Sequence, residues 1–108
     1  MGKKSVLQSD NTRCYICHQR DEPLDLHHVF YGALRKKSNH YGCIVWLCHN
    51  RCHIFGENAV HRNHEVDLWL KRRCQRALMI REGWTIEQFR EEFYKNYLDL
   101  DEGENKNA

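Results

Sequence analysis

Apolar residues at helical spacing mark the second half of the chain. They recur every four positions, as on one face of a helix: Val66, Leu70, Cys74 and Leu78. Asn63 just before this stripe can cap a first turn, and Gly83 just after it can end a last turn. The pattern predicts a long helix over His64 to Glu82.

A second, shorter helix is predicted after Gly83. Thr85 and Gln88 form a capping box, in which each side chain accepts the backbone N–H of the other residue. The apolar positions of this helix are Ile86, Phe89 and Phe93. Three later apolar residues are expected to pack onto the body: Tyr97, Leu98 and Leu100.

The first half of the chain contains short β-prone runs instead. Leu24 to Phe30 and Cys43 to Leu47 are typical of strands, and a basic loop over Tyr31 to Gly42 joins them. Two short strands joined in this way predict an antiparallel hairpin. Cys48 to Glu57 is then expected to hold a short helix.

Together these elements predict an α+β fold. The 108 residues fit one compact domain and not two. We assign this domain to residues 12–100, with a strand-containing unit at 12–63 and a helical extension at 64–100. Residues 1–11 and 101–108 are polar, and we expect them to be flexible.

The composition is that of a soluble protein, with 41% hydrophobic and 30% charged residues. No apolar run approaches the roughly 18–20 residues that span a bilayer. Lys3 and Lys4 are not followed by the apolar stretch of a signal peptide. We therefore expect a cytoplasmic protein without a membrane partner.

Positive charge is concentrated in the first part of the chain. The formal net charge of +2 is too small to indicate a partner. Residues 1–62 carry nine Lys and Arg against five Asp and Glu, whereas residues 63–108 carry eight against ten. The excess of four in the first part (nine minus five) weakly favours a polyanionic partner.

Four of the six cysteines form two closely spaced pairs, Cys14-x-x-Cys17 and Cys48-x-x-x-Cys52. Zn2+ takes four ligands in a tetrahedron, and one backbone turn can supply two cysteines at these spacings. Because four cysteines leave no position for water, we expect a structural zinc site. Disulfides or free buried thiols are the alternative, and the lack of a signal peptide disfavours disulfides.

Two further questions about the cysteines stay open at this point. Neighbouring histidines could replace one cysteine as a zinc ligand: His18, His49 and His53. Cys43 and Cys74 belong to neither pair, and Cys74 is expected to be a core thiol because it falls on the helical stripe.

Several of the eight histidines gather around the cysteine pairs. His27 and His28 are adjacent on the first predicted strand, His53 directly follows Cys52, and His61 comes shortly after. Hydrolysis of a phosphodiester needs a base that takes a proton from water and a cation that faces the phosphate. Histidines can supply both the base and the ligands of the cation.

These residues resemble the HNH endonucleases. In that family a ββα-metal unit has a His-His or Asp-His pair on its first strand and a ligand histidine on its helix, and two cysteine pairs often clamp it. The matching residues look most like the small HNH proteins of bacteriophages and prophages. They lie between Cys14 and Asn63: His27-His28-Val29-Phe30, Arg35-Lys36, Ser38, Tyr41-Gly42, Val45-Trp46-Leu47-Cys48, Cys52-His53 and Val60-His61.

The resemblance implies both a fold and an activity. The fold is a small ββα-metal unit clamped by a four-cysteine zinc site and followed by two C-terminal helices. The activity is that of a metal-dependent DNA endonuclease or nickase in the cytoplasm of a bacterial host cell. His28 would be the general base, and a catalytic Mg2+, Mn2+, Ni2+ or Zn2+ would be bound by His27 and His53, with His61 as a further ligand.

Two features of the pattern depart from the family. Where the family often has an asparagine on the second strand, this chain has Cys43, and Asn39 and Asn50 are out of register. Adjacent residues of an ideal strand also point to opposite faces, so His27 and His28 need a local distortion to reach one site.

The predicted loop between the strands is basic at Arg35, Lys36 and Lys37. In an HNH-like protein we expect these side chains to contact DNA phosphates. The alternative is an ordinary solvated loop.

Two other classes of function remain open. A non-catalytic zinc-knuckle protein would bind DNA through the basic loop without needing His28, and the missing asparagine is its best support. A zinc-stabilised module could instead bind a phage or host protein. That module would expose apolar residues on its C-terminal helices and have little affinity for DNA.

Overall fold

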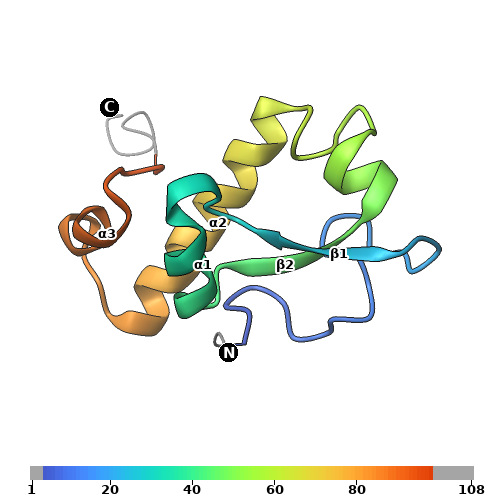
Figure 1. The fold of residues 1–108 in the computed structure, drawn as a ribbon. Coiled ribbons are helices and arrows are strands. Elements are labelled where there is room, and N and C mark those ends of the chain that lie inside the picture. The colour runs from blue at the N-terminus through green and yellow to red at the C-terminus, as the bar shows by residue number, and fades with distance from the viewer. Residues whose placement is uncertain (1–3, 99–108) are drawn as a thin grey trace.

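The computed structural model describes residues 4–98, which form a small α+β fold (Figure 1). Two strands cross the middle of the molecule, and the last helix lies towards one end. The elements follow in this order: β1 (Leu24–His28), the short 3-10 turn η1 (Gly32–Leu34), α1 (Arg35–Tyr41), β2 (Ile44–Cys48), the π-helix η2 (His49–Ile54), α2 (His64–Glu82) and α3 (Ile86–Phe93). The tail predicted at 101–108 lies outside the described residues.

β1 and β2 pair antiparallel, which confirms the predicted hairpin. Leu24 lies opposite Cys48, and His28 lies opposite Ile44. β1 ends two residues earlier than predicted, at His28, and β2 is displaced by one residue towards the C-terminus. The pairing brings the end of β2, where the second cysteine pair begins, alongside the start of β1.

The connection between the strands is helical, so the predicted basic loop is wrong. α1 occupies most of it and ends at Gly42, whose φ of 79° is in the left-handed region that favours glycine. Ser38 is fully buried; its Oγ accepts the Phe30 N–H at 2.9 Å and donates to the Phe30 carbonyl at 2.8 Å. These bonds join residues eight positions apart, and the polar sequence of α1 carries no apolar stripe that would reveal the helix.

The N-terminal segment lies along the other edge of β2, although residues 1–11 were predicted to be flexible. The Val6 N–H donates to the Gly42 carbonyl at 2.8 Å. The Trp46 N–H donates to Gln8 Oε1 at 2.8 Å, and Ser5 Oγ donates to the Ile44 carbonyl. A polar segment pairing partly through side chains has no periodic signature, so pattern reasoning missed it. Residues 1–3 lie outside the described part of the chain.

α2 begins and ends where the sequence predicts. Asn63 Oδ1 accepts the backbone N–H of Glu65 at 3.0 Å and that of Val66 at 3.3 Å. Gly83 ends the helix with a φ of 72°. α3 begins with the predicted capping box of Thr85 and Gln88.

The apolar faces of α2 and α3 pack into one core with the hairpin. The fully buried members of the predicted faces are Leu70, Cys74, Leu78, Phe89 and Phe93. Val66 is only partly buried, and Ile86 is 39% exposed. Phe30, after β1, joins the two parts, since its ring centroid lies 4.8 Å from that of Phe93 and 5.1 Å from that of Tyr97.

Within residues 4–98, no helix combines the length and the apolar character that crossing a membrane would require.

Candidate functional site

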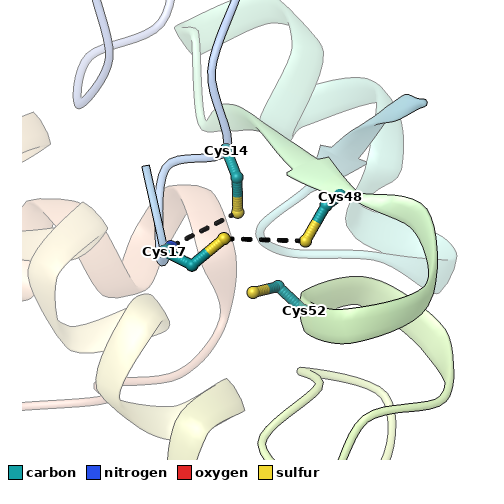
Figure 2. Close-up of side chains that lie close together, drawn as sticks. All are labelled: Cys14, Cys17, Cys48 and Cys52. Atoms are coloured by element: carbon teal, nitrogen blue, oxygen red, sulfur yellow. Dashed lines mark hydrogen bonds between the residues drawn. The ribbon is translucent and has the colours of Figure 1, made fainter. Parts of the chain in front are cut away.

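Four cysteines from two distant segments converge in the structure, as Figure 2 shows. Cys14 and Cys17 come from the turn before β1, whereas Cys48 ends β2 and Cys52 lies in η2. Their sulfur atoms all lie within 4.8 Å of one another. The predicted set of four is therefore assembled at one point and could hold a metal ion such as Zn2+.

The separation of one pair of sulfur atoms matches that expected around a tetrahedral ion. Sγ of Cys17 lies 3.8 Å from Sγ of Cys48. Zn–S bonds of about 2.3 Å in a regular tetrahedron place two sulfur atoms about 3.8 Å apart. A disulfide would require about 2.05 Å, and all six cysteines, which lie within the described residues, are unpaired.

The histidines that could have replaced a cysteine lie elsewhere. His18 is exposed. Its backbone N–H donates to the Cys14 carbonyl, which closes the turn around the first cysteine pair. His49 and His53 belong to a different cluster, with Asp25. The candidate zinc site is therefore made of cysteine alone.

A positive side chain that the sequence did not predict adjoins the cysteines. Arg51 donates to Sγ of Cys17 at 3.2 Å and also pairs with Asp21 at 2.8 Å. Four thiolates around Zn2+ carry a net charge of −2, so a guanidinium beside them offsets part of that charge. Burial raises the pKa of Cys14, but donated backbone N–H bonds from Cys17, Cys48 and Ile16 outweigh it and lower the pKa to about 7.

Three histidines form a second cluster. His27 lies on β1, His53 lies in η2, and His61 lies in the segment that returns from η2. The ring centroids form a nearly equilateral triangle, with 5.2 Å between His27 and His53, 5.1 Å between His27 and His61, and 4.8 Å between His53 and His61. The His61 N–H donates to the His53 carbonyl at 3.2 Å, which holds the returning segment against η2.

The ring of His27 has a buried nitrogen atom that could bind a metal ion. It is only 2% exposed, and its Nε2 has no hydrogen-bond partner among residues 4–98. A buried polar atom without a partner is costly, and an ion bound between the three rings would satisfy it. Burial lowers the pKa of His27 to about 3, and positive charge on His53 and His61 acts in the same direction. The ring is therefore neutral at pH 7, which is the form that binds metals.

His28 lies beside this triangle but outside it. Both His27 and His28 line a hollow of about 390 Å³, together with Leu26, Tyr31, Gly32, Arg35, His53 and His61. His27 is buried, whereas His28 is half-buried. Both residues belong to β1, with His28 at its last position, and both nevertheless line the same hollow.

An asparagine contacts His28 although it is out of register in the sequence. The side chain of Asn39, on α1, lies near the His28 ring and raises the pKa of His28. Burial and the positive charge of Arg35 lower the pKa of His28, and the side chain of Asn39 opposes this shift. The position predicted for the family's asparagine holds Cys43, which is fully buried. The helical turn of α1 brings Asn39 to His28, and helix α1 was not predicted.

The three basic residues predicted to meet DNA differ in their surroundings. Arg35 is exposed and lines the hollow, and Lys36 is exposed on the same helix. Lys37 is engaged within the protein, because its Nζ donates to the Glu92 carbonyl at 2.7 Å and lies 4.8 Å from the ring centre of Tyr94. The structure thus places only Arg35 at the candidate site.

A carboxylate lies behind the histidine triangle. Asp25 Oδ2 lies 2.8 Å from His53 Nδ1 and 2.6 Å from His49 Nδ1. Burial raises the pKa of Asp25, but these hydrogen bonds outweigh it and hold the pKa below its ordinary value. The sequence contained two signals for this cluster. Asp25 precedes His27 by two positions, and His49 precedes His53 by four.

Comparisons of the chain with protein-family models, with curated proteins and with solved structures found no match.

Proposed function

We propose that this protein is a zinc-stabilised, metal-dependent DNA endonuclease or nickase of the HNH type. The observation that carries the proposal is the triangle of His27, His53 and His61, in which Nε2 of His27 is unpartnered among the described residues, with His28 lining the same hollow. Three ligands and a nearby fourth imidazole are what metal-assisted hydrolysis requires.

The four cysteines would hold one structural Zn2+ in this proposal. The ion would join the turn before β1 to the start of η2, and so fix the helix that carries His53. A domain of this size has a small core, and such a site commonly contributes much of its folding free energy.

The triangle would hold one divalent ion, such as Mg2+, Mn2+, Ni2+ or Zn2+. Bound there, it would supply positive charge to the phosphate and to the leaving 3′ oxygen. His28 would accept a proton from water, whose oxygen forms the new bond to phosphorus while the bond to the 3′ oxygen breaks. Asn39, which lies near His28, would orient the His28 ring.

Arg35 would contact the DNA backbone next to the scissile phosphate. It is exposed, and it lines the hollow that contains His28. A guanidinium matches phosphate oxygens in geometry as well as in charge.

One observation favours a protein-binding module as a second candidate. Ile80 on α2 is 83% exposed, and Tyr94 at the end of α3 is 73% exposed. Apolar side chains on the C-terminal helices are the feature expected of that alternative.

Cleavage of supercoiled plasmid tests the proposed function. Purified protein is incubated with plasmid and a series of divalent metals, and nicked and linear products are separated on gels. We expect nicked or linear DNA with at least one metal, and no product with chelator. His40, exposed on α1, supplies the matched control His40→Ala, which should cleave as wild type. Absence of cleavage with every metal would contradict the nuclease, and tight DNA binding in that case would favour the non-catalytic zinc-knuckle protein.

A further inference from the structure

The carboxylate of Asp25 contacts one member of the histidine triangle, His53. Asp25 precedes His27 by two residues on β1, so both side chains leave the strand on the same face. That face lies against η2, which carries His49 and His53 one turn apart. Strand and helix together bring Asp25 Oδ2 to Nδ1 of His53, at 2.8 Å.

This contact decides which nitrogen of His53 is free. A carboxylate can only accept hydrogen bonds, and a neutral imidazole carries a single N–H. The hydrogen therefore resides on Nδ1, and the lone pair is left on Nε2. The opposite tautomer would place the Nδ1 lone pair against a negative oxygen.

We propose that Asp25 is a positioning residue, which holds His53 in the Nδ1-protonated tautomer so that Nε2 can bind the metal. The inference rests on the proposed function, because it requires a metal at His27, His53 and His61. Carboxylates that accept the second N–H of a ligand histidine fix the ring and raise its basicity.

His49 would help to hold the Asp25 carboxylate in place from the solvent-exposed side. Its Nδ1 lies 2.6 Å from the same Oδ2, and its side chain is 46% exposed, compared with 14% for His53. It would orient the carboxylate without touching the metal.

Asp25, His49 and His53 could alternatively hold an ion among themselves. Two ligand atoms at about 2.0–2.1 Å from a tetrahedral Zn2+ lie about 3.3 Å apart. The separations of Oδ2 from the two Nδ1 atoms are 2.6 and 2.8 Å, which are hydrogen-bond lengths. The distances therefore favour hydrogen bonds over a second metal site.

Metal titration of the full, zinc-loaded chain tests this role. Ni2+ is titrated by calorimetry into wild type, Asp25→Asn, Asp25→Ala and His49→Ala. Asp10→Asn is the matched control, because Asp10 is an exposed aspartate bonded to Thr12. We expect one Ni2+ per wild-type chain beyond the zinc. Loss of the outer carboxylate should weaken that binding about 10- to 100-fold, and Asp25→Ala should bind Ni2+ more weakly than Asp25→Asn. His49→Ala should weaken the binding less than either Asp25 variant, and Asp10→Asn should keep it.

The tautomer of His53 can be measured directly, and it would not change if Asp25 had only a structural role. Nitrogen-15 spectra of the imidazoles should show His53 protonated on Nδ1 in wild type and in Asp10→Asn. In Asp25→Ala they should show a mixture of both tautomers, while zinc content and thermal unfolding stay close to wild type.

The failures of the two proposals are distinguishable. Wild type that binds no Ni2+ beyond the zinc would overturn the catalytic metal, and with it this inference. If Asp25→Ala binds Ni2+ as tightly as wild type, the inference about Asp25 is overturned but the proposed catalytic metal is not. Two Ni2+ in wild type, with one lost in His49→Ala, would also overturn it and would assign Asp25, His49 and His53 to a second metal site.

Discussion

The side chain of Asn39 reaches the imidazole of His28 across the hairpin connection. The two residues are eleven positions apart, and α1 is what brings them together. The sequence pattern indicated Cys43 in place of an orienting asparagine, which favoured a non-catalytic protein. Asn39 beside His28 weakens that objection, because an amide lies near the proposed base.

Removal of Asn39 should slow cleavage without changing metal content. A net hydrogen bond of about 0.5–1.5 kcal/mol corresponds to about a two- to thirteenfold change in rate. We expect Asn39→Ala to lose that much of the single-turnover rate. Asn50→Ala, at an exposed position of η2, is the control. Equal rates for the two variants would show that the contact does not orient His28.

Substitution of His28 should affect the chemical step alone. His28 lies outside the triangle, so His28→Ala should retain zinc, Ni2+ binding and DNA affinity. General-base catalysis typically contributes about 10²–10⁴-fold, and cleavage should fall by that factor. If His28→Ala cleaves as fast as wild type, another group must take the proton, and His61 is the next candidate.

Substitution of His53 should affect the metal instead. His53→Ala removes one of the three proposed ligands, so it should weaken Ni2+ binding and abolish cleavage at low metal concentration. Excess metal should restore part of the activity of His53→Ala and none of that of His28→Ala. Cleavage rates measured over a metal titration make the comparison. Similar metal dependence in both variants would argue against the assigned roles.

Zinc should be coupled to folding through the four cysteines. Cys52→Ser should lose the metal and unfold at a lower temperature than wild type, because the ligands come from two segments 31 residues apart at Cys17 and Cys48. Cys74→Ala, at a buried position outside the cluster, should keep one zinc per chain. Elemental analysis and thermal unfolding measure both effects. Native protein without zinc, or zinc retained in Cys52→Ser, would reject the assignment.

The basic residues of α1 should contribute unequally to DNA affinity. Arg35→Ala should weaken binding for all sequences and should reduce the slope of log affinity against log salt by about 0.9, as expected for one phosphate contact. Lys37→Ala should leave the slope nearly unchanged, because Lys37 is paired with Glu92. Binding isotherms at several salt concentrations give the slopes. A larger change for Lys37→Ala than for Arg35→Ala would place the DNA elsewhere.

The sequence by itself determined the features whose causes are local. Helix α2 starts at Asn63 and stops at Gly83 because a cap and a left-handed glycine act within one turn. The cysteine spacings likewise follow from what a single turn of backbone can offer a metal. The antiparallel hairpin follows from two short apolar runs. Only the ends of its strands differ from those predicted.

Only the tertiary structure decided which distant groups meet. The polar sequence of α1 gives no periodic signal, and the buried bonds of Ser38 to Phe30 hold this helix in place. Asp25 reaches His53 because β1 packs against η2, and Arg51 reaches Cys17 because the two segments that carry the cysteine pairs converge. Such contacts depend on the relative placement of whole elements, to which every packed residue contributes, and no local pattern along the chain records that placement.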